Sequence, residues 1–212
     1  MINYLYILAS LSLFHTALGA VAFAPSENQN GTHAPLPVAD IVNRGTVVEE
    51  IVNISNRTHF AIILPKSNRT TVAASKAPSG TRVFYSHDST TDSQYKLPED
   101  FFTTSSASNQ GGKRNKGFVQ LTGCINMARA PQLKATDKGG VYHSQSSGLN
   151  DMNLQGSRCE GYNHFVECVQ PITSQFAMRC CNDDEDCPSP SDNQKCSDLL
   201  KGDYGACAED RK

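Results

Sequence analysis

Apolar side chains at alternate positions in two runs of the last third of the chain predict a β-hairpin. We read residues 163–169 and 175–181 as strands whose successive side chains point to opposite faces, which is the period of a β-strand. Five residues join the two runs, which is a common hairpin length. His164, Val166 and Cys168 would share one face of the first strand. On the second strand, the residues of one face would be Phe176, Met178 and Cys180.

Two further elements are expected around this hairpin. Residues 117–126 are rich in β-branched and apolar side chains and read as an opening strand. Residues 191–202 begin with a helix-capping type of sequence and end at Gly202, so they predict a short helix held by Cys196.

The first half of the chain shows shorter apolar runs at 46–52, 59–64, 70–74 and 82–85. The first fits a helix or a strand, and the others have strand lengths and strand-forming residues. We expect residues 21–102 to form a small β-rich module or a partly disordered region. The uncharged run Phe60–Leu64 could pair edge to edge or seed fibrils if it were exposed, but an ordinary buried strand is the favoured interpretation.

A Ser- and Gly-rich stretch separates the two halves. Residues 103–116 bury little apolar surface and read as a flexible linker. The pair Lys113 and Arg114 resembles the dibasic sites of kexin-type processing proteases. Two interpretations stay open: a pro-region that is released on cleavage, or a solubilising basic pair. The cysteine-rich domain would then span residues 117–212.

The N-terminus carries the features of a secretory signal peptide. Residues 4–14 are apolar but too short to cross a bilayer, and Ala20-Val21-Ala22 fits a cleavage site. We expect residues 1–20 to be removed and the protein to be extracellular, with delivery into a host as one route; an uncleaved membrane anchor is the alternative. Four Asn-X-Ser/Thr acceptors lie before residue 70, at Asn30, Asn53, Asn56 and Asn68.

Eight cysteines provide the strongest signal in the sequence. An even number of cysteines in a secreted chain predicts disulfide bonds throughout, so we expect a disulfide-stapled, mainly β fold with one short helix. A Cys180–Cys181 bond is disfavoured, because bridged Cα atoms prefer about 5.5 Å and neighbours lie about 3.8 Å apart. The other pairings stay open among Cys124, Cys159, Cys168, Cys180, Cys181, Cys187, Cys196 and Cys207.

Composition argues against several classes of function. The net charge is −2 and the isoelectric point is about 6.3, so no basic field favours nucleic acid. The chain has no Trp and only 8% aromatic residues, which argues against a large aromatic-lined pocket.

Candidate chemical sites are weak. His164 between Cys159 and Cys168 could suggest a thiol protease or zinc, but both need thiolates that an oxidising compartment would consume. Residues 182–186 are acidic but lack the ligand spacing of a calcium loop. His143 lies beside Ser144, Ser146 and Ser147, without the Gly-X-Ser-X-Gly elbow of a hydrolase. We therefore expect no catalytic residue, no metal and no cofactor.

Five motifs in order resemble a family of small cysteine-rich secreted fungal proteins. They are residues 117–123, 137–144, 156–167, 179–188 and 202–207, and the similarity spans about 117–207. The resemblance implies a secreted, effector-like protein. The layout of a glycosylated half followed by a cysteine-rich half is also similar to the rust transferred proteins, which are associated with host delivery, protease inhibition and fibril formation.

These observations favour a secreted glycoprotein that binds an extracellular or host protein, or wall carbohydrate. The first alternative is an inhibitor of extracellular proteases that uses the hairpin connection as a rigid loop, formed by Gln170, Pro171, Ile172, Thr173 and Ser174. A wall- or fibril-forming structural protein and an enzyme with an unrecognised site are further alternatives. No nucleic-acid partner and, after signal cleavage, no membrane partner is expected.

Overall fold

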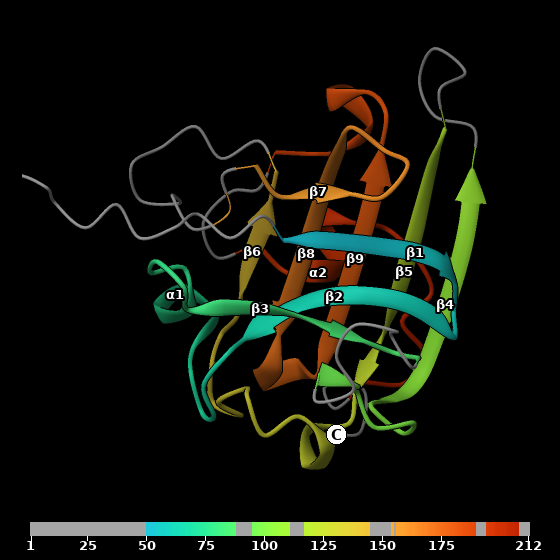
Figure 1. Ribbon diagram of the computed structural model, residues 1–212. Helices are drawn as coiled ribbons and strands as arrows, with labels where there is room; N and C mark the ends of the chain where they lie inside the picture. Colours follow the sequence, from blue (N-terminus) through green and yellow to red (C-terminus); the bar gives the residue numbers. More distant parts are fainter. Residues whose placement is uncertain are drawn as a thin grey trace, which may run out of the picture. The chain divides into compact units, whose positions relative to one another are not determined.

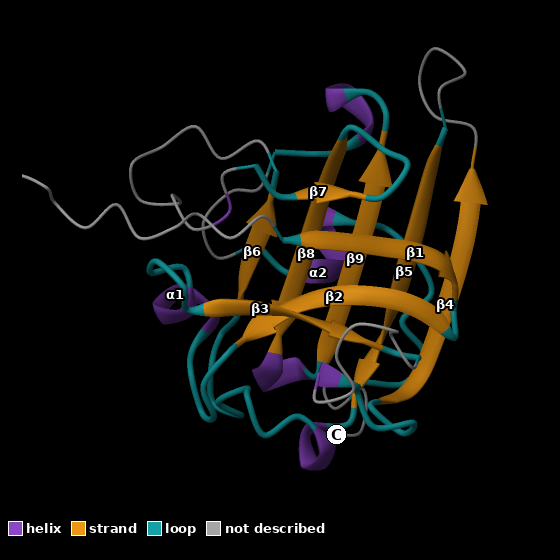
Figure 2. Ribbon diagram, viewed as in Figure 1, coloured by secondary structure: helices purple, strands orange, loops and turns teal. Residues whose placement is uncertain are grey.

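Strands make up most of the secondary structure in the computed structural model (Figure 2), which describes residues 50–87, 95–110, 117–144, 154, 156–189 and 194–207. All of these belong to one unit, residues 43–212. The signal peptide, Asn30, Lys113 and Arg114 lie outside the described residues.

A four-stranded sheet is built mainly from the first half of the chain. Its order is β3-β2-β1-β7, with antiparallel neighbours except for the parallel pair β1–β7. The strands are β1 (Ile51–Asn56), β2 (His59–Pro65), β3 (Thr81–Tyr85) and β7 (Arg158–Cys159). The helix α1 (Val72–Ser75) lies between β2 and β3 in the sequence.

A five-stranded antiparallel sheet has the order β4-β5-β9-β8-β6. Its strands are β4 (Phe102–Gln110), β5 (Phe118–Ile125), β6 (Gly140–His143), β8 (His164–Gln170) and β9 (Gln175–Cys181). The predicted hairpin is confirmed as β8 and β9, paired from His164–Cys181 to Gln170–Gln175. The predicted opening strand is confirmed as β5.

The two sheets pack face to face with their strands running across one another (Figure 1). Buried side chains from both sheets fill the space between them, including Ile62 and Leu64 of β2 and Leu121, Phe176 and Met178 of the larger sheet. This is the crossed type of β-sandwich. The disulfide Cys159–Cys180 joins β7 to β9 and so links the two sheets covalently.

The other face of the five-stranded sheet is covered by residues 194–207, which we call the C-terminal segment. It contains α2 (Cys196–Leu199), which confirms the predicted short helix over a shorter range. The bonds Cys168–Cys196 and Cys124–Cys207 fasten it to β8 and β5. Side chains of the sheet also donate to its backbone: Gln120 Nε2 to Lys201 O at 2.8 Å and Thr122 Oγ1 to Asp203 O at 2.6 Å.

The close approach of this segment explains Gly202. A Cβ at that position would lie 2.8 Å from Gln120 Nε2 and 2.9 Å from Thr122 Cγ2. Such contacts are shorter than a Cβ normally makes, so any other residue at this position would force the Gln120 and Thr122 side chains to move away from the C-terminal segment.

All eight cysteines are in disulfide bonds, as predicted. The fourth bond, Cys181–Cys187, closes a short loop after β9. Cys180 and Cys181 bond to different segments on opposite faces of the sheet, as their alternation on a strand requires. Both faces are buried, whereas the sequence pattern had indicated one buried face.

Three predictions are wrong. Residues 103–110 are not a linker but form most of β4, because their Ser- and Thr-rich backbone pairs with β5 along its whole length. Residues 70–74 are not a strand: the hydroxyl of Thr71 accepts from Ala74 N at 3.1 Å and caps α1. The two halves are not separate modules, since β1–β3 and the larger sheet bury the same core.

The aggregation-prone run Phe60–Leu64 forms most of β2. It lies between β1 and β3 and is buried along its length. The favoured interpretation, an ordinary buried strand, is therefore confirmed.

Cleavage between β4 and β5 should not release the first half of the chain. All four disulfides lie after residue 117, so no covalent bond would then join residues 50–110 to the rest. However, β4 would remain paired with β5 and the shared core would remain buried. After treatment with a kexin-type protease, we expect both pieces to co-elute in native gel filtration and to separate on a denaturing, non-reducing gel. Separate elution of the N-terminal piece would contradict this.

The disulfides should differ in their contribution to stability according to the loops they close. The bonds Cys124–Cys207 and Cys181–Cys187 span 83 and 6 residues. In the chain-entropy model, replacing both cysteines by Ala should lower the free energy of unfolding by about 4–5 kcal/mol for the first pair and about 2 kcal/mol for the second. All four cysteines are buried, so both double variants remove similar buried groups and differ mainly in the length of the loop. Urea denaturation measures the two losses. An equal loss of unfolding free energy in the two variants would show that loop entropy does not dominate the contribution of these disulfides to stability.

Candidate binding site at the edge of the larger sheet

A groove of about 540 Å³ opens beside the first residues of β4. One wall comes from the turn between β1 and β2, at Arg57 and Thr58. The other comes from the segment Leu97–Phe101 and from the start of β4, residues 102–105. The groove therefore lies where the end of the smaller sheet meets the edge of the larger one.

Aromatic rings form the base of the groove and hold it in shape. Phe102 lies 5.5 Å from Phe60, 5.0 Å from Phe101 and 5.2 Å from Phe176, measured between ring centroids. Phe60 and Phe101 are buried and Phe102 is half-buried. These rings stabilise the junction but present little aromatic surface to a ligand.

Polar groups line the upper part of the groove. Ser86 accepts from Phe60 N at 2.8 Å and lies 2.8 Å from the carbonyl oxygen of Thr58, so its hydroxyl closes the end of the β2–β3 pair. The charged lining residues are Arg57 and Glu99, both exposed. The groove thus offers hydroxyls and one charge of each sign.

Among the described residues, β4 is an edge strand. In the described part of the sheet, β4 has β5 as its neighbour on one side and no strand on the other. On β5, successive backbone N–H groups point to opposite sides. Asn126 N donates to Phe101 O at 2.7 Å, whereas Ile125 N donates to Ser174 O at 2.7 Å. Even-numbered residues of β5 therefore direct their backbone groups toward β4.

This alternation decides which residues of β4 are free to pair. The β4 residues paired with the even-numbered residues of β5 direct their backbone N–H and C=O groups toward β5. These β4 residues are Thr104, Ser106 and Ser108. The β4 residues between and after them, Ser105, Ala107 and Asn109, direct their N–H and C=O groups away from β5, toward the edge. The open edge therefore offers three residues for strand pairing, starting at the groove.

β4 lacks the features that usually prevent edge pairing. Over its nine residues, Phe102–Gln110, it contains no charged side chain, no Pro and no Gly. Natural edge strands are commonly protected by lysines, prolines or shortness. A bulge between Phe102 and Thr104 is the one irregularity.

The predicted binding loop is mostly buried. Pro171–Thr173 forms a 3₁₀ turn in which Pro171 and Thr173 are buried. Ile172 is 51% exposed and projects alone, and its N–H donates to Asp137 O at 3.0 Å. Ser174 has a φ of 58° and its carbonyl accepts from Ile125. The connection is thus a tight turn with one protruding side chain.

The predicted thiol and zinc residues are consumed in cross-links. Cys159 and Cys168 bond to Cys180 and Cys196, so neither offers a thiolate to His164. Within the described ranges, no group of three or more His, Cys, Asp or Glu side chains could hold a metal ion. Ser144 Oγ accepts from Phe165 N at 3.0 Å and serves the pairing of β6 with β8; Ser146 and Ser147 lie outside the described residues.

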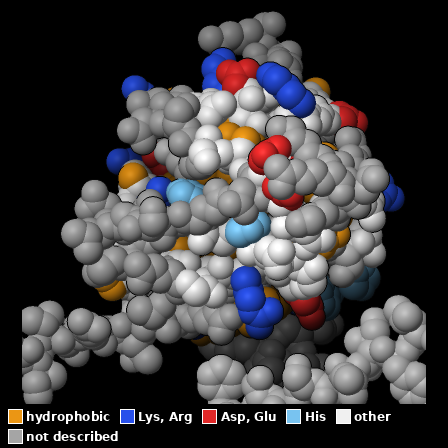
Figure 3. All heavy atoms as spheres, turned by 90° about the horizontal axis from the view of Figure 1, so that it is seen from above, with side chains coloured by type: hydrophobic (Ala, Val, Ile, Leu, Met, Phe, Trp, Pro, Cys, Tyr) orange, Lys and Arg blue, Asp and Glu red, His pale blue; other side chains and the backbone are white. Residues whose placement is uncertain are grey.

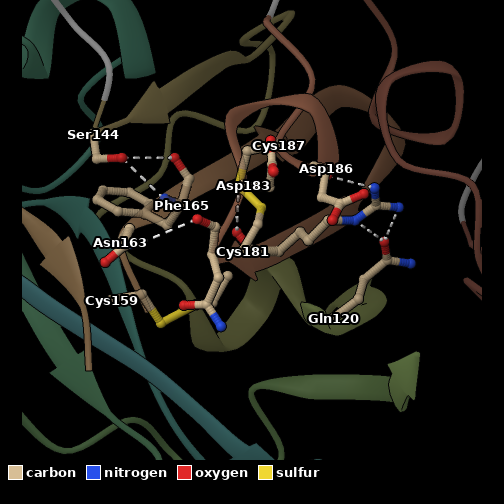
Figure 4. The surroundings of a disulfide bond; sticks show 12 residues. Gln120, Ser144, Cys159, Asn163, Phe165, Cys181, Asp183, Asp186 and Cys187 are labelled. Atoms are coloured by element: carbon tan, nitrogen blue, oxygen red, sulfur yellow. Dashed lines mark hydrogen bonds between the residues drawn. A yellow bond between two sulfur atoms is a disulfide. The ribbon is translucent and has the colours of Figure 1, made fainter. Parts of the chain in front are cut away.

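The acidic stretch 182–186 is stabilised by an arginine (Figure 4). Arg179 donates to Asp186 O at 2.8 Å and, through Nε and Nη2, to Gln120 Oε1 at 2.9 and 2.7 Å. Its guanidinium also lies 4.0 Å from the centre of the Phe118 ring. Partial burial lowers the pKa of Arg179. A single Arg among the apolar residues of a strand indicates a buried or half-buried charge with polar partners. The sequence analysis did not single out Arg179.

A buried carboxyl group lies between the sheets. Glu167 of β8 is wholly buried, and its Oε2 accepts from Ile63 N of β2 at 3.0 Å. Its Oε1 has no hydrogen-bond partner among the described residues. Loss of hydration raises the pKa of Glu167 well above its usual value, and nearby Glu50 raises it further. Because Glu167 is inaccessible, we assign it a structural role.

The candidate glycosylation sites differ in their surroundings. Asn56, the last residue of β1, and Asn68, in a turn, are both exposed. Asn53 is half-buried within β1, and its Nδ2 lies 3.5 Å from Glu160 Oε2. The three sites are therefore not equivalent in the folded protein.

On the face in Figure 3, the hydrophobic side chains that can be seen are scattered among polar ones. Ile172 is the one large hydrophobic side chain of the described residues that is exposed. None of the described helices is long and apolar enough to cross a membrane.

No family model, curated protein or solved structure matches the chain. The similarity to cysteine-rich secreted fungal proteins therefore rests on the sequence motifs alone, and it stays a prediction.

Replacing Glu167 by Gln should stabilise the protein increasingly as pH rises. The folded state retains the Glu167 proton above pH 4.5, where the unfolded chain releases it, so this residue makes stability fall with rising pH by at most about 1.4 kcal/mol per pH unit. In urea denaturation from pH 4 to 8, the gain from Glu167→Gln should be small at pH 4 and grow above it. Glu99→Gln, at an exposed site, is the matched carboxyl-to-amide exchange. A gain independent of pH would refute a neutral Glu167.

Proposed function

We propose that this protein is secreted and acts by binding an extracellular or host partner protein, as an effector-like binding module without catalytic activity. The partner would place an extended segment alongside β4, where the groove receives one of its side chains. Four disulfides and the absence of a membrane-crossing helix in the described residues are compatible with an extracellular protein.

The observation that carries this proposal is the unprotected edge of β4. Its outward backbone groups at Ser105, Ala107 and Asn109 can pair with an added strand, which is a recurrent mode of peptide recognition. Main-chain hydrogen bonds would supply affinity, and the groove at the start of the strand would supply selectivity. The rigid double cover of the sheet would keep the edge in place before binding.

The other candidate partners and roles fit less well. Carbohydrate sites commonly use exposed aromatic rings, whereas the rings under this groove are buried or half-buried. Protease inhibition through Gln170–Ser174 would need a protruding loop, and Ile172 is the one exposed apolar side chain there. A fibril-forming role gains no support from Phe60–Leu64, which is buried.

The experiment is a selection of random peptides displayed on phage against the full-length protein. The enriched peptides should bind wild type and lose at least tenfold in affinity for Ala107→Pro. Pro removes an outward N–H at residue 107 without removing a bond to β5, so this variant should fold normally. In labelled protein, peptide binding should shift the amide resonances of Ser105, Ala107 and Asn109 more than those of Ser106 and Ser108.

The matched variant is Ser106→Pro. It removes an N–H that faces β5, so it should lower the melting temperature clearly, whereas Ala107→Pro should not. If no peptide is enriched, or if the peptides bind Ala107→Pro as well as wild type, β4 is not the binding edge.

A further inference from the structure

We propose that Asn56 carries an N-linked glycan in the secreted protein and that Asn53, three residues earlier, does not. This inference rests on the secretory route in the proposed function. It goes beyond that proposal because it selects between two adjacent acceptor sites and places the glycan beside the groove.

The modification itself needs one co-reactant, a lipid-linked pyrophosphate oligosaccharide. A bond forms between the Asn Nδ2 and C1 of the first sugar, and the bond from C1 to the pyrophosphate oxygen breaks. The lipid pyrophosphate leaves and the amide nitrogen loses one proton. The folded protein must then accommodate a large hydrated group at that nitrogen.

The turn around Asn56 suits such a group. Asn56 Oδ1 accepts from Thr58 N and from the Thr58 hydroxyl, both at 2.8 Å, and from His59 N at 3.0 Å. One carbonyl oxygen therefore satisfies three donors of the turn between β1 and β2. Asn56 and its sequon partner Thr58 are both exposed. A glycan on Nδ2 would keep all three bonds, because they use the other atom of the amide.

The surroundings of Asn53 are less permissive. Asn53 lies inside β1, where it pairs with Ala61 of β2. On the other side, Glu160 N donates to Val52 O at 2.8 Å and the Glu160 carboxylate lies against Asn53 Nδ2. The Asn53 Oδ1 is wholly covered and has no hydrogen-bond partner among the described residues. A glycan here would displace the segment that follows β7.

The position of Asn56 gives its glycan a place beside the candidate site. The next two residues, Arg57 and Thr58, form one wall of the groove. The glycan would therefore flank the end of β4 that begins at Phe102 and leave the Ala107 end of the strand farther away. We expect a partner segment to approach β4 from that less hindered end.

Site-specific mass spectrometry tests the inference. The full chain is secreted from a yeast host and treated with peptide-N-glycosidase F in ¹⁸O water, which converts each glycosylated Asn to labelled Asp. We expect label at Asn56 and none at Asn53. Asn68, which is exposed in its own turn, reports independently on passage through the glycosylation machinery.

Each outcome has a distinct meaning. Label at Asn53, with or without Asn56, overturns the inference and leaves the proposed secretion intact. Label at Asn68 alone also overturns it. Absence of label at all three sites in secreted material overturns the inference, whereas absence of the protein from the medium contradicts the proposed secretion as well.

Two matched variants separate the neighbouring sequons. Ser55→Ala removes the Asn53 sequon and Thr58→Ala removes the Asn56 sequon, both at exposed positions. We expect Ser55→Ala to leave the mass of the secreted protein unchanged apart from the substitution, and Thr58→Ala to lose the mass of one glycan. Thr58→Ser keeps the sequon and should keep the glycan, which controls for disturbance of the turn.

Discussion

The rest of the structure depends on a sheet that is buried on both faces. β5, β8 and β9 present apolar side chains in both directions, so they need cover from the smaller sheet on one side and from the C-terminal segment on the other. Hydrophobic burial favours both contacts. The disulfides Cys159–Cys180, Cys168–Cys196 and Cys124–Cys207 then fix each cover in place.

Buried polar groups add specificity to this arrangement. Glu167 satisfies the Ile63 amide across the sheets, and Arg179 with Gln120 joins the acidic loop and the C-terminal segment to the sheet. Each of these hydrogen bonds needs one particular donor and acceptor, whereas apolar packing accepts many combinations of side chains. The neutral carboxyl at Glu167 costs stability where the unfolded chain would be ionised, but it leaves the β2 amide paired in the interior.

The sequence was sufficient to predict several strands and the disulfide bonding, but it was not sufficient to predict how the strands pack together. Period-two alternation identified β8 and β9, and the even cysteine count identified full bridging. The strand β4 was missed because Thr, Ser and Asn residues resemble a linker unless their pairing with β5 is known. The site was missed for the same reason, since both the groove and the open edge depend on where β4 lies. Glu167 shows the limit again, because its burial depends on β2 of the smaller sheet lying across it, and the sequence of β8 alone does not reveal that contact.

The parallel pairing of β1 with β7 has a consequence for biosynthesis. β1 is translated about a hundred residues before its neighbour Cys159, and contacts so distant in sequence form slowly. The smaller sheet therefore leaves the ribosome with its uncharged central strand still lacking the surface that will cover it. During synthesis this strand is therefore exposed to pairing with other chains until the C-terminal half has emerged.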